Sequence, residues 1–565
     1  MKNIILVDVD ALMPSRLGYS GNLNSVAPTL NKIADSSLNC TNAFSMGNPT
    51  EFALPGLFAS AYLLDANGYR YGISENQITF AEILKENGYV TSAFMTAFRP
   101  KKDQYQRGFD DYYNLIDIQV TEKNLTNTAK WYREQYNSKS SIISRVECIK
   151  ELIKYYEEYL NDLLSYCDNW ESYNKSLIVP ESSIFNNVDY SAVRKEILID
   201  QKIFLKDKHE YIKKYLNGGT FGIITISQNV KQYRYNKITT TLMDIKVRFI
   251  YLLNIILMWR KSTNFSSAKS LIGFIFYIVI KGRKSTLTRY PSGQFVLNTF
   301  KNWVRKKYDK KKPFFTYMKL MDAHELNNYS HDVQCKDTNK DEYSMLSRFF
   351  KDVKKDKEYM GNALYDSAIR YSDEIIKKLF VFLKEEKLLD NTIVVITADH
   401  GTQFSNIPIR DKKNHRVNSF FDELYRIPLM FVNKDIKSQV NEELVSSIDI
   451  NTTLLDMVGI KAPSTFRGES ILNNNFLRSY VMFENQGRGP CDLKYKPISV
   501  CVRSDLQKIV YIVKPGNPNE GKVIEAFDLF DDPFEYNNLA TNTLFVGKCS
   551  DLIDIAKYRI KEILG

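Results

Sequence analysis

The sequence predicts an α/β/α sandwich with a mixed, mostly parallel central sheet, a long helical insertion and a small C-terminal α+β subdomain. Three observations support this fold class. Apolar runs of strand length alternate with helix-like segments up to about residue 120, which is typical of a parallel sheet covered by helices. A Tyr- and Lys-rich stretch without strand alternation follows, to about residue 284, and the α/β alternation returns near residue 313. The 565 residues are enough to bury such a core.

The individual elements follow from periodicity and local signals. The apolar run from Asn3 to Val9 has strand length and is expected to be the first core strand. Another such run, Thr392 to Thr397, is expected to be a core strand of the second half. The other expected elements are helices over 27–36, 51–60, 78–87, 144–166, 363–386 and 549–563, and strands over 90–94, 313–318, 428–432, 498–503 and 508–513.

These elements divide the chain into four parts. The first part of the α/β core is expected over 1–120 and its second part over 285–475, with the helical insertion at 121–284 between them. The α+β subdomain is expected over 476–565. No internal repeat and no low-complexity linker interrupts this organisation.

Two apolar runs in the insertion, Phe249 to Trp259 and Leu271 to Ile280, have basic flanks. Each is about half of the roughly 20 residues that a membrane-spanning helix requires. A basic and apolar pattern of this kind fits a helix in the membrane interface, whereas helices that are apolar all round are more often buried. The segment 240–285 is therefore either a buried helical hairpin or a peripheral membrane contact.

Charge and cysteine content bear on partners and location. The net charge of +11 favours an anionic partner, but it is spread over helices without an aromatic strand platform, so no nucleic-acid module is expected. The seven cysteines form no CxxC pair, and the N-terminus reaches Asp8 without a secretory signal. We therefore expect a cytoplasmic protein, with the inner membrane face as an alternative if 240–285 contacts lipid.

Candidate metal ligands follow the two best strand predictions. Asp10 lies just past the first strand, and Asp399 and His400 lie just past the strand over 392–397. Open α/β sheets place their ligands at such strand ends. With the hydroxyl of Thr50 they would supply two carboxylates, one imidazole and one alkoxide to a single divalent ion, for which Mn²⁺ is expected first and Zn²⁺, Ca²⁺ or Mg²⁺ are alternatives. A single aspartate in such a place is more often a helix cap.

Thr50 is the candidate nucleophile. An unassisted alcohol is a weak nucleophile near neutral pH, and a coordinated cation stabilises its alkoxide. Pro49 restricts the backbone before it, and a helix opening over 51–60 would add backbone donors for an anion. A Pro-Thr pair by itself is only a turn signal.

Two histidines lie in segments that resemble loops of a site. His324 follows the strand over 313–318, and His415 lies in a polar stretch between Asp399 and the strand over 428–432. An imidazole near the leaving oxygen can stabilise or protonate it, although either residue can equally be a surface histidine. The basic residues beside His415 either bind an anionic substrate or belong to a solvated loop. They are Arg410, Lys412 and Lys413.

Eight stretches, taken in order, resemble the sulfatase-like branch of the alkaline phosphatase and sulfatase superfamily. They cover roughly residues 1–110 and 313–540. The stretches are NIILVDVDALMPSRLGYSG (3–21), APTLNKIADSSLNCTNAFSMGNPTEFALPGLFAS (27–60), PFFTYMKLMDAHE (313–325), NTIVVITADHGTQF (391–404), ELYRIPLMFV (423–432), SIDINTTLLDMVGI (447–460), FRGESIL (466–472) and FDLFDDPFEYNNLA (527–540).

The resemblance assigns roles to residues already singled out. Asp10, Asp399 and His400 match metal-ligand positions of the family, Thr50 matches its nucleophile position, and His324 and His415 resemble its substrate-side histidines. Asp8 lies outside the match, because Asp10 occupies the usual place. The resemblance implies no organic cofactor.

One departure from the family narrows the chemistry. Sulfatases carry a Cys or Ser that is converted to formylglycine in a CxPxR or SxPxR context, whereas this chain has Thr50-Glu51-Phe52-Ala53-Leu54-Pro55. Threonine cannot give that aldehyde. It is similar instead to the branch that transfers phosphoglycerol or phosphoethanolamine to envelope glycans and lipids through a phosphorylated threonine. Those relatives are usually membrane-anchored by transmembrane helices, which this sequence lacks.

Three functions remain open at this point. The first is a metal-dependent transferase that takes a phosphoryl-type group from an anionic small-molecule, lipid-linked or glycan-linked phosphodiester donor and passes it to a surface-glycan precursor. The second is a phosphodiesterase, phosphatase or sulfuric-ester hydrolase, in which water is the acceptor. The third is a catalytically inactive member that binds a glycan or another partner.

Overall fold

The computed structural model describes residues 1–23, 25–68, 72–74, 76–96, 105–114, 118–138, 141, 143–176, 190–222, 293–324, 357–402, 419–487, 491, 493, 496–514 and 517–565. The chain divides into two compact units. The core unit comprises Met1–Leu115, Ser292–His324 and Gly361–Gly565, and the helical unit comprises Ile116–Pro291 and Glu325–Met360. The finer boundaries at residues 120, 284 and 475 stay predictions.

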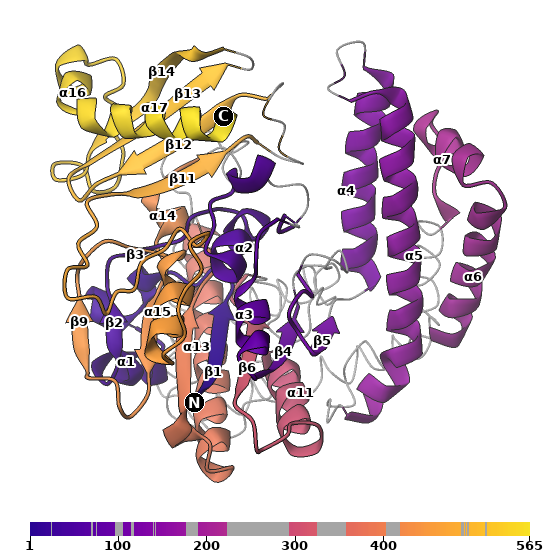
Figure 1. Ribbon diagram of the computed structural model, residues 1–565, viewed down its shortest axis with the longest axis horizontal. Helices are drawn as coiled ribbons and strands as arrows, with labels where there is room; N and C mark the ends of the chain where they lie inside the picture. Colours follow the sequence, from indigo (N-terminus) through magenta and orange to yellow (C-terminus); the bar gives the residue numbers. More distant parts are fainter. Residues whose placement is uncertain are drawn as a thin grey trace, which may run out of the picture. The chain divides into compact units, whose positions relative to one another are not determined.

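A mixed eight-stranded sheet forms the centre of the core unit, in the order β5-β4-β6-β1-β7-β8-β2-β9 (Figure 1). The pairs β4–β5, β4–β6, β1–β6, β1–β7 and β2–β9 are parallel, whereas β7–β8 and β2–β8 are antiparallel. The strands are β1 (Asn3–Val9), β2 (Leu38–Cys40), β4 (Val90–Met95), β5 (Asp111–Asn114), β6 (Phe314–Leu320), β7 (Thr392–Thr397), β8 (Leu429–Val432) and β9 (Gln439–Asn441). This arrangement confirms the predicted mixed, mostly parallel sheet.

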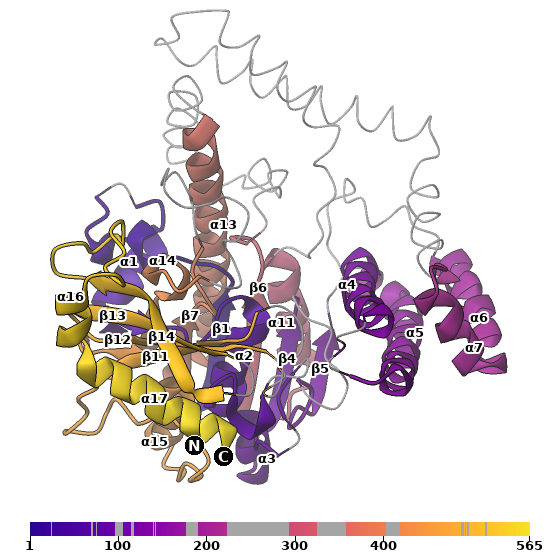
Figure 2. The same cartoon turned by 90° about the horizontal axis from the view of Figure 1, so that it is seen from above.

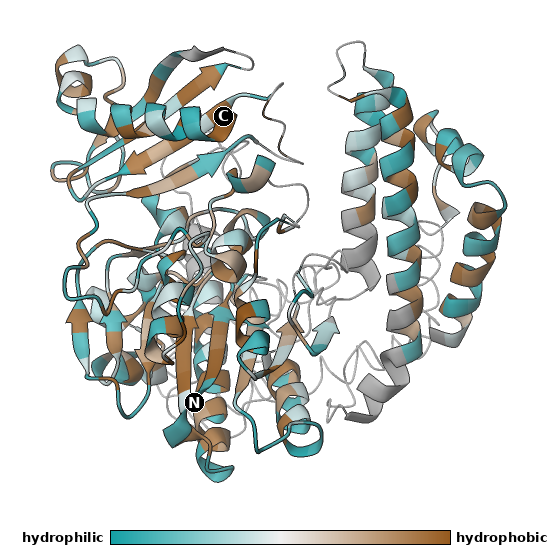
Figure 3. Cartoon of the chain, viewed as in Figure 1, coloured by the Kyte–Doolittle hydropathy of each residue, from teal (hydrophilic) through white to brown (hydrophobic). Residues whose placement is uncertain are grey.

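The central strands are apolar because both faces of the sheet are covered. Every residue of β1, β6 and β7 is buried, and Figure 3 shows these strands coloured mainly hydrophobic. Figure 2 shows α1 and α13 on one face of the sheet and α3 and α15 on the other. The helices of this part of the core unit are α1 (Pro28–Asp35), α2 (Thr50–Ala59), α3 (Phe80–Glu86), α11 (Gly293–Lys306), α13 (Lys357–Glu385), α14 (Asp422–Tyr425) and α15 (Asp449–Met457).

Local signals explain where several helices begin. Pro28 occupies the first turn of α1, where its missing N–H costs nothing. Thr79 caps α3 in a capping box with Glu82. The N–H of Gly293, the first residue of α11, donates to Asp322 Oδ2 over 2.9 Å, so a carboxylate from the end of β6 binds the start of the helix that precedes it.

The C-terminal part of the core unit is the predicted α+β subdomain. Its antiparallel sheet has the order β11-β12-β13-β14, and α17 contacts β12 and β13. Leu552 and Ala556 of α17 pack with Val502 and Ile509 in one buried cluster. The elements are β11 (Val481–Asn485), β12 (Ile498–Arg503), β13 (Gln507–Lys514), β14 (Asn517–Asp528), α16 (Thr543–Lys548) and α17 (Ser550–Leu564), and a separate small pair joins β3 (Ala43–Phe44) to β10 (Val445–Ser446).

The helical unit contains α4 (Ile118–Asn137), α5 (Arg145–Ser176), α6 (Tyr190–Lys206) and α7 (Lys208–Leu216). Its core is rich in tyrosine, and the buried carboxylate of Asp200 accepts hydrogen bonds from Tyr156 and Tyr211. The segment 240–285, with its two apolar runs, lies outside the described residues. Within the described ranges, no helix combines the length and the apolar character needed to cross a membrane.

Candidate metal centre and nucleophile

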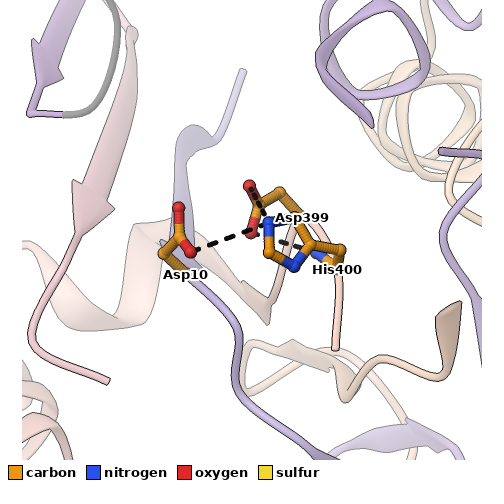
Figure 4. A group of neighbouring side chains, drawn as sticks. All are labelled: Asp10, Asp399 and His400. Carbon is orange, nitrogen blue, oxygen red and sulfur yellow. Dashed lines mark hydrogen bonds and ion pairs between the residues drawn. The ribbon is translucent and has the colours of Figure 1, made fainter. Parts of the chain in front are cut away.

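The candidate ligands converge where two neighbouring parallel strands end. Asp8 near the end of β1 lies opposite Thr397 at the end of β7, so Asp10 and the Asp399-His400 pair leave the sheet at the same edge. Figure 4 shows the carboxylates of Asp10 and Asp399 gathered beside one nitrogen of the His400 ring. The sheet register therefore brings together residues that are almost 400 positions apart.

These three side chains have the properties of a metal site. One ligand atom from each of Asp10, Asp399 and His400 lies within 4.8 Å of the others, and all three residues are buried. His400 Nε2 is 3.9 Å from Asp10 Oδ1 and 3.6 Å from Asp399 Oδ2. Asp10 Oδ1 accepts no hydrogen bond from the described residues. Two carboxylates and an imidazole, with a buried oxygen still needing a partner, fit a divalent cation of the Mn²⁺ or Zn²⁺ type.

Thr50 presents its hydroxyl to this cluster from the first residue of α2. Its Oγ1 donates to Asp10 Oδ2 over 3.2 Å and lies 3.1 Å from His400 Nε2, and the residue is 5% exposed. The preceding turn tolerates only glycine at position 47, because an added Cβ there would lie 2.1 Å from the Phe52 carbonyl oxygen. Helix α2 begins at Thr50, so the positive end of its dipole lies beside the hydroxyl.

The structure adds Lys319 and Asp8, which sequence reasoning missed. Lys319, on β6, is fully buried, and its Nζ lies 2.8 Å from Asp8 Oδ2, 2.9 Å from Asp10 Oδ2 and 2.9 Å from Asp399 Oδ2. Tyr317 donates to the same oxygen of Asp8 over 2.6 Å. The available signal was a charged residue inside an otherwise apolar strand, present in both FFTYMKL and NIILVDV. We call Asp8, Asp10, Asp399 and Lys319 the Lys319 cluster.

Burial and mutual attraction set the pKa values in this cluster. Burial raises the pKa of Asp8 to about 7, although Lys319 opposes the shift. Burial would lower the pKa of Lys319, but Asp10, Asp399 and Asp8 outweigh it and hold the pKa of this ammonium well above its usual range. Burial opposes ionisation of Asp399, but His400 and Lys319 prevail and lower its pKa. The ammonium therefore stays charged.

His400 has an environment that suits a ligand. Burial would lower its pKa, but Asp399 and Asp10 outweigh this effect and raise it. Its other ring nitrogen, Nδ1, lies 2.6 Å from the Gly401 carbonyl oxygen, which fixes the orientation of the ring.

The two predicted substrate-side histidines have different outcomes. His324 follows β6, is partly exposed, and its ring centroid lies 6.5 Å from that of His400. It is therefore next to the candidate metal centre, on the side that reaches solvent. His415 and its basic neighbours Arg410, Lys412 and Lys413 lie outside the described residues.

A second buried charge group supports the segment after His400. Lys508 Nζ lies 2.9 Å from Asp422 Oδ1 and also pairs with Glu535, while Arg503 Nε lies 3.1 Å from Asp422 Oδ2. We call these four residues the Lys508 cluster. Asp422 begins α14, and the Leu424 carbonyl of that helix accepts the N–H of Gly401 over 2.9 Å. The cluster thus stabilises a helix that binds the backbone next to His400.

Comparisons with known proteins agree with this fold and identify the family. The family model described as Sulfatase matches residues 2–174 and 220–460. The chain is 26% identical to arylsulfatase K of Canis lupus familiaris over 32% of this chain and 33% of that protein. It is also 26% identical to the multifunctional alkaline phosphatase superfamily protein PehA of Trinickia caryophylli, over 34% of this chain and 38% of that one. The matched part spans about a third of the length of these curated relatives.

A solved structure extends the likeness over the whole fold. The phosphonate monoester hydrolase of Agrobacterium radiobacter superposes with a TM-score of 0.53 and 12% identity, covering 98% of this chain and 95% of that one. At this identity the likeness concerns the fold alone. The family model covers most of the chain, with ligand-type residues gathered at the carboxyl edge of its sheet. The chain belongs to the sulfatase family of the alkaline phosphatase superfamily.

Proposed function

We propose that this protein is a metal-dependent transferase that moves a phosphoryl-type group from a phosphodiester donor through a covalent intermediate on Thr50. The observation that carries the proposal is the position of the Thr50 hydroxyl, which is buried and lies within 3.2 Å of Asp10 and 3.1 Å of His400. A threonine cannot be converted into formylglycine, the aldehyde that sulfatases use. Direct attack by its hydroxyl oxygen is the chemistry that remains.

The reaction has two displacements. In the first, Thr50 Oγ1 gives up its proton and forms a bond to phosphorus while the bond from phosphorus to the leaving alcohol breaks. The alcohol departs with a proton, so the step has no net gain or loss of protons. His324 is partly exposed beside His400 and is our candidate for supplying that proton. In the second, an acceptor hydroxyl forms the new bond to phosphorus, the bond to Thr50 Oγ1 breaks, and Thr50 recovers its proton.

Asp10, Asp399 and His400 would hold the divalent cation, with the Thr50 oxygen beside them. When bound, the ion would lower the pKa of the Thr50 hydroxyl and offset negative charge on the transferred group. Mn²⁺ is the first expectation, and Zn²⁺, Ca²⁺ and Mg²⁺ are the alternatives. The expected donor is an anionic lipid- or glycan-linked phosphodiester or a small molecule, and the expected acceptor is a surface-glycan precursor. A cytoplasmic location and a contact with lipid through 240–285 belong to the same proposal.

A hydrolase is the second candidate, and the names of the relatives favour it. Arylsulfatase K and the alkaline phosphatase superfamily protein PehA are both named as enzymes of ester-cleaving superfamilies. With water as the acceptor, the same Thr50 intermediate would make the protein a phosphodiesterase or phosphatase. Cleavage of sulfuric esters would also be hydrolysis, but Thr50 would then have to act as the nucleophile in place of the formylglycine aldehyde.

Trapping the intermediate tests the proposal. Purified protein with Mn²⁺ is incubated with a panel of phosphodiester donors, and the peptide containing Thr50 is examined by mass spectrometry. We expect a phosphoryl-type adduct on Thr50 that Thr50→Ser retains and Thr50→Ala loses. Thr453→Ala, which removes another buried threonine hydroxyl, serves as the matched control and should retain the adduct.

Product analysis separates the candidates. Transfer to a glycan acceptor supports the transferase, and release of the free group into water supports the hydrolase. Turnover of a sulfate ester without turnover of any phosphodiester would refute the proposal.

A further inference from the structure

The charges of the Lys319 cluster do not balance. Asp8, Asp10, Asp399 and Lys319 are all fully buried, and one ammonium group faces three carboxylates. With His400 neutral, as a metal ligand must be, two negative charges are left without a partner when Asp8 is ionised, and one is left when Asp8 is protonated. Buried charges of this kind are strongly destabilising unless they are paired or coordinate a cation. One divalent ion would balance the cluster.

The position of the Lys319 ammonium is also unusual. Its Nζ contacts one oxygen of each of three carboxylates, at 2.8, 2.9 and 2.9 Å, and these carboxylates come from β1 and from the segments that follow β1 and β7. Asp8 lies directly opposite Lys319 in the β1–β6 register, so the sheet itself determines their distance. Nζ therefore occupies the place that a cation bridging the three carboxylates would take.

We propose that the Lys319 ammonium is a built-in second cation of this metal centre, and that it limits the centre to a single divalent ion. Asp8 is its counterion and is not a ligand of the ion. Lys319 is thus a positioning residue, which holds the carboxylates of Asp10 and Asp399 that would bind the ion. The inference rests on the proposed function only in that the centre binds a metal.

A purely structural ion pair would make different predictions. Such a pair would stabilise the fold, and its loss would change neither the number of metal ions bound nor their affinity. A built-in cation instead competes with divalent ions for the same oxygens. Removing the ammonium should therefore make room for a further ion, and removing its counterion should make the ammonium repel the first ion more strongly.

The number of bound ions is the first measurement. Lys319→Met keeps a side chain of similar length without the charge. After equilibrium dialysis against MnCl₂ and elemental analysis, we expect about one Mn²⁺ per chain for the native protein and about two for Lys319→Met. A Lys319→Met chain that still binds one ion would overturn the proposal.

The affinity for the first ion is the second measurement, and it does not depend on folding of Lys319→Met. In Asp8→Asn the amide can still accept the hydrogen bond from Tyr317, but Lys319 keeps only two counterions. We expect the Kd for Mn²⁺ to rise at least about tenfold, and Asp8→Asn/Lys319→Met to return it towards the native value. An unchanged Kd in Asp8→Asn, or a double variant as weak as the single one, would count against Lys319 as a cation of the centre.

Arg559→Met is the matched control, because Arg559 is a buried cation between the carboxylates of Glu484 and Asp65, which are not in the metal site. It should leave both the number of ions and the Kd unchanged. A change in either quantity would show that the loss of any buried cation has the effect, which contradicts the proposal. These binding measurements are independent of turnover. If the inference fails while the Thr50 adduct forms, the proposed function stands, and the reverse outcome leaves the inference standing without it.

Discussion

Two fully buried lysines in the core unit have opposite electrical surroundings. Lys508 shares its cluster with Arg503, and together they face Asp422 and Glu535, so positive and negative charges are equal in number. Lys319 is the one lysine or arginine that contacts Asp8, Asp10 and Asp399 among the described residues, and His400 borders two of these carboxylates. The Lys508 cluster is complete without any ligand, whereas the Lys319 cluster requires a divalent cation to reach the same balance.

The difference follows the position of each cluster in the fold. The Lys319 cluster lies at the carboxyl edge of the parallel part of a sheet, where ligands of open α/β folds bind. The Lys508 cluster joins an antiparallel sheet to α14. In the part of the chain that the structure describes, the only candidate group of metal ligands is Asp10, Asp399 and His400, which borders Lys319. A deficit of positive charge thus accompanies the candidate functional cluster, and balance accompanies the other one.

The largest expected effect removes the chemistry and leaves both clusters in place. Thr50→Ala deletes the proposed nucleophile, and we expect kcat/KM to fall by at least about 10³-fold, because no other hydroxyl occupies its position. Single-turnover kinetics with the donor found by adduct trapping measure it. Thr50→Ser should retain part of the rate. Activity of Thr50→Ala within tenfold of the native rate would exclude a covalent intermediate on this residue.

Breaking the balanced cluster should affect stability alone. Lys508→Met leaves Asp422 and Glu535 buried with one cation fewer, and we expect a loss of about 3–5 kcal/mol in the free energy of unfolding. Denaturant titration measures the loss. Mn²⁺ should stabilise this variant by as much as it stabilises the native protein. A loss below about 1 kcal/mol would mean that the pair is solvated in solution.

Removing the metal should destabilise the protein, because the negative charge of the Lys319 cluster is then unbalanced. We expect EDTA to lower the melting temperature of the native protein, since a ligand present at a hundredfold excess over its Kd stabilises the folded state by about 2.7 kcal/mol. Differential scanning calorimetry with EDTA and with increasing MnCl₂ measures the shift. His400→Ala should abolish the dependence on Mn²⁺. An equal melting temperature in EDTA and in excess Mn²⁺ would argue against a metal centre.

The smallest expected effect concerns Asp322, a buried carboxylate for which the described residues supply no ion pair. Burial raises the pKa of Asp322 from 3.8 to about 7, against the hydrogen bond from Gly293. The folded state therefore holds this proton more tightly than the unfolded state, and the resulting stabilisation is complete below pH 3.8 and is lost as the pH rises to about 7. Asp322→Asn should flatten this part of the stability profile, as measured by urea unfolding between pH 4 and 8. Identical slopes for the two proteins would refute the shift.

Much of the fold was predictable because its signals are local. The apolar runs 3–9 and 392–397 became β1 and β7 with those bounds, and the expected strand over 498–503 became β12. Long helices were predicted with errors at their ends: 363–386 became α13 (Lys357–Glu385) and 144–166 became α5 (Arg145–Ser176). Short strands such as β5 and β9 were missed, because a run of three or four residues has too little periodicity to be recognised.

The sequence by itself determined the candidate ligands, because Asp10 and Asp399 each follow an apolar strand. It also singled out Thr50, through the family resemblance and not through the Pro-Thr pair, which alone is only a turn signal. The tertiary structure alone decided what surrounds them. The contact between Lys319 and Asp8 joins residues 311 positions apart, and it exists because β6 pairs with β1 in one particular register. Pairing of strands distant in sequence depends on the packing of the whole sheet, and no local pattern encodes it. The charge deficit that calls for a cation is therefore visible only in the folded chain.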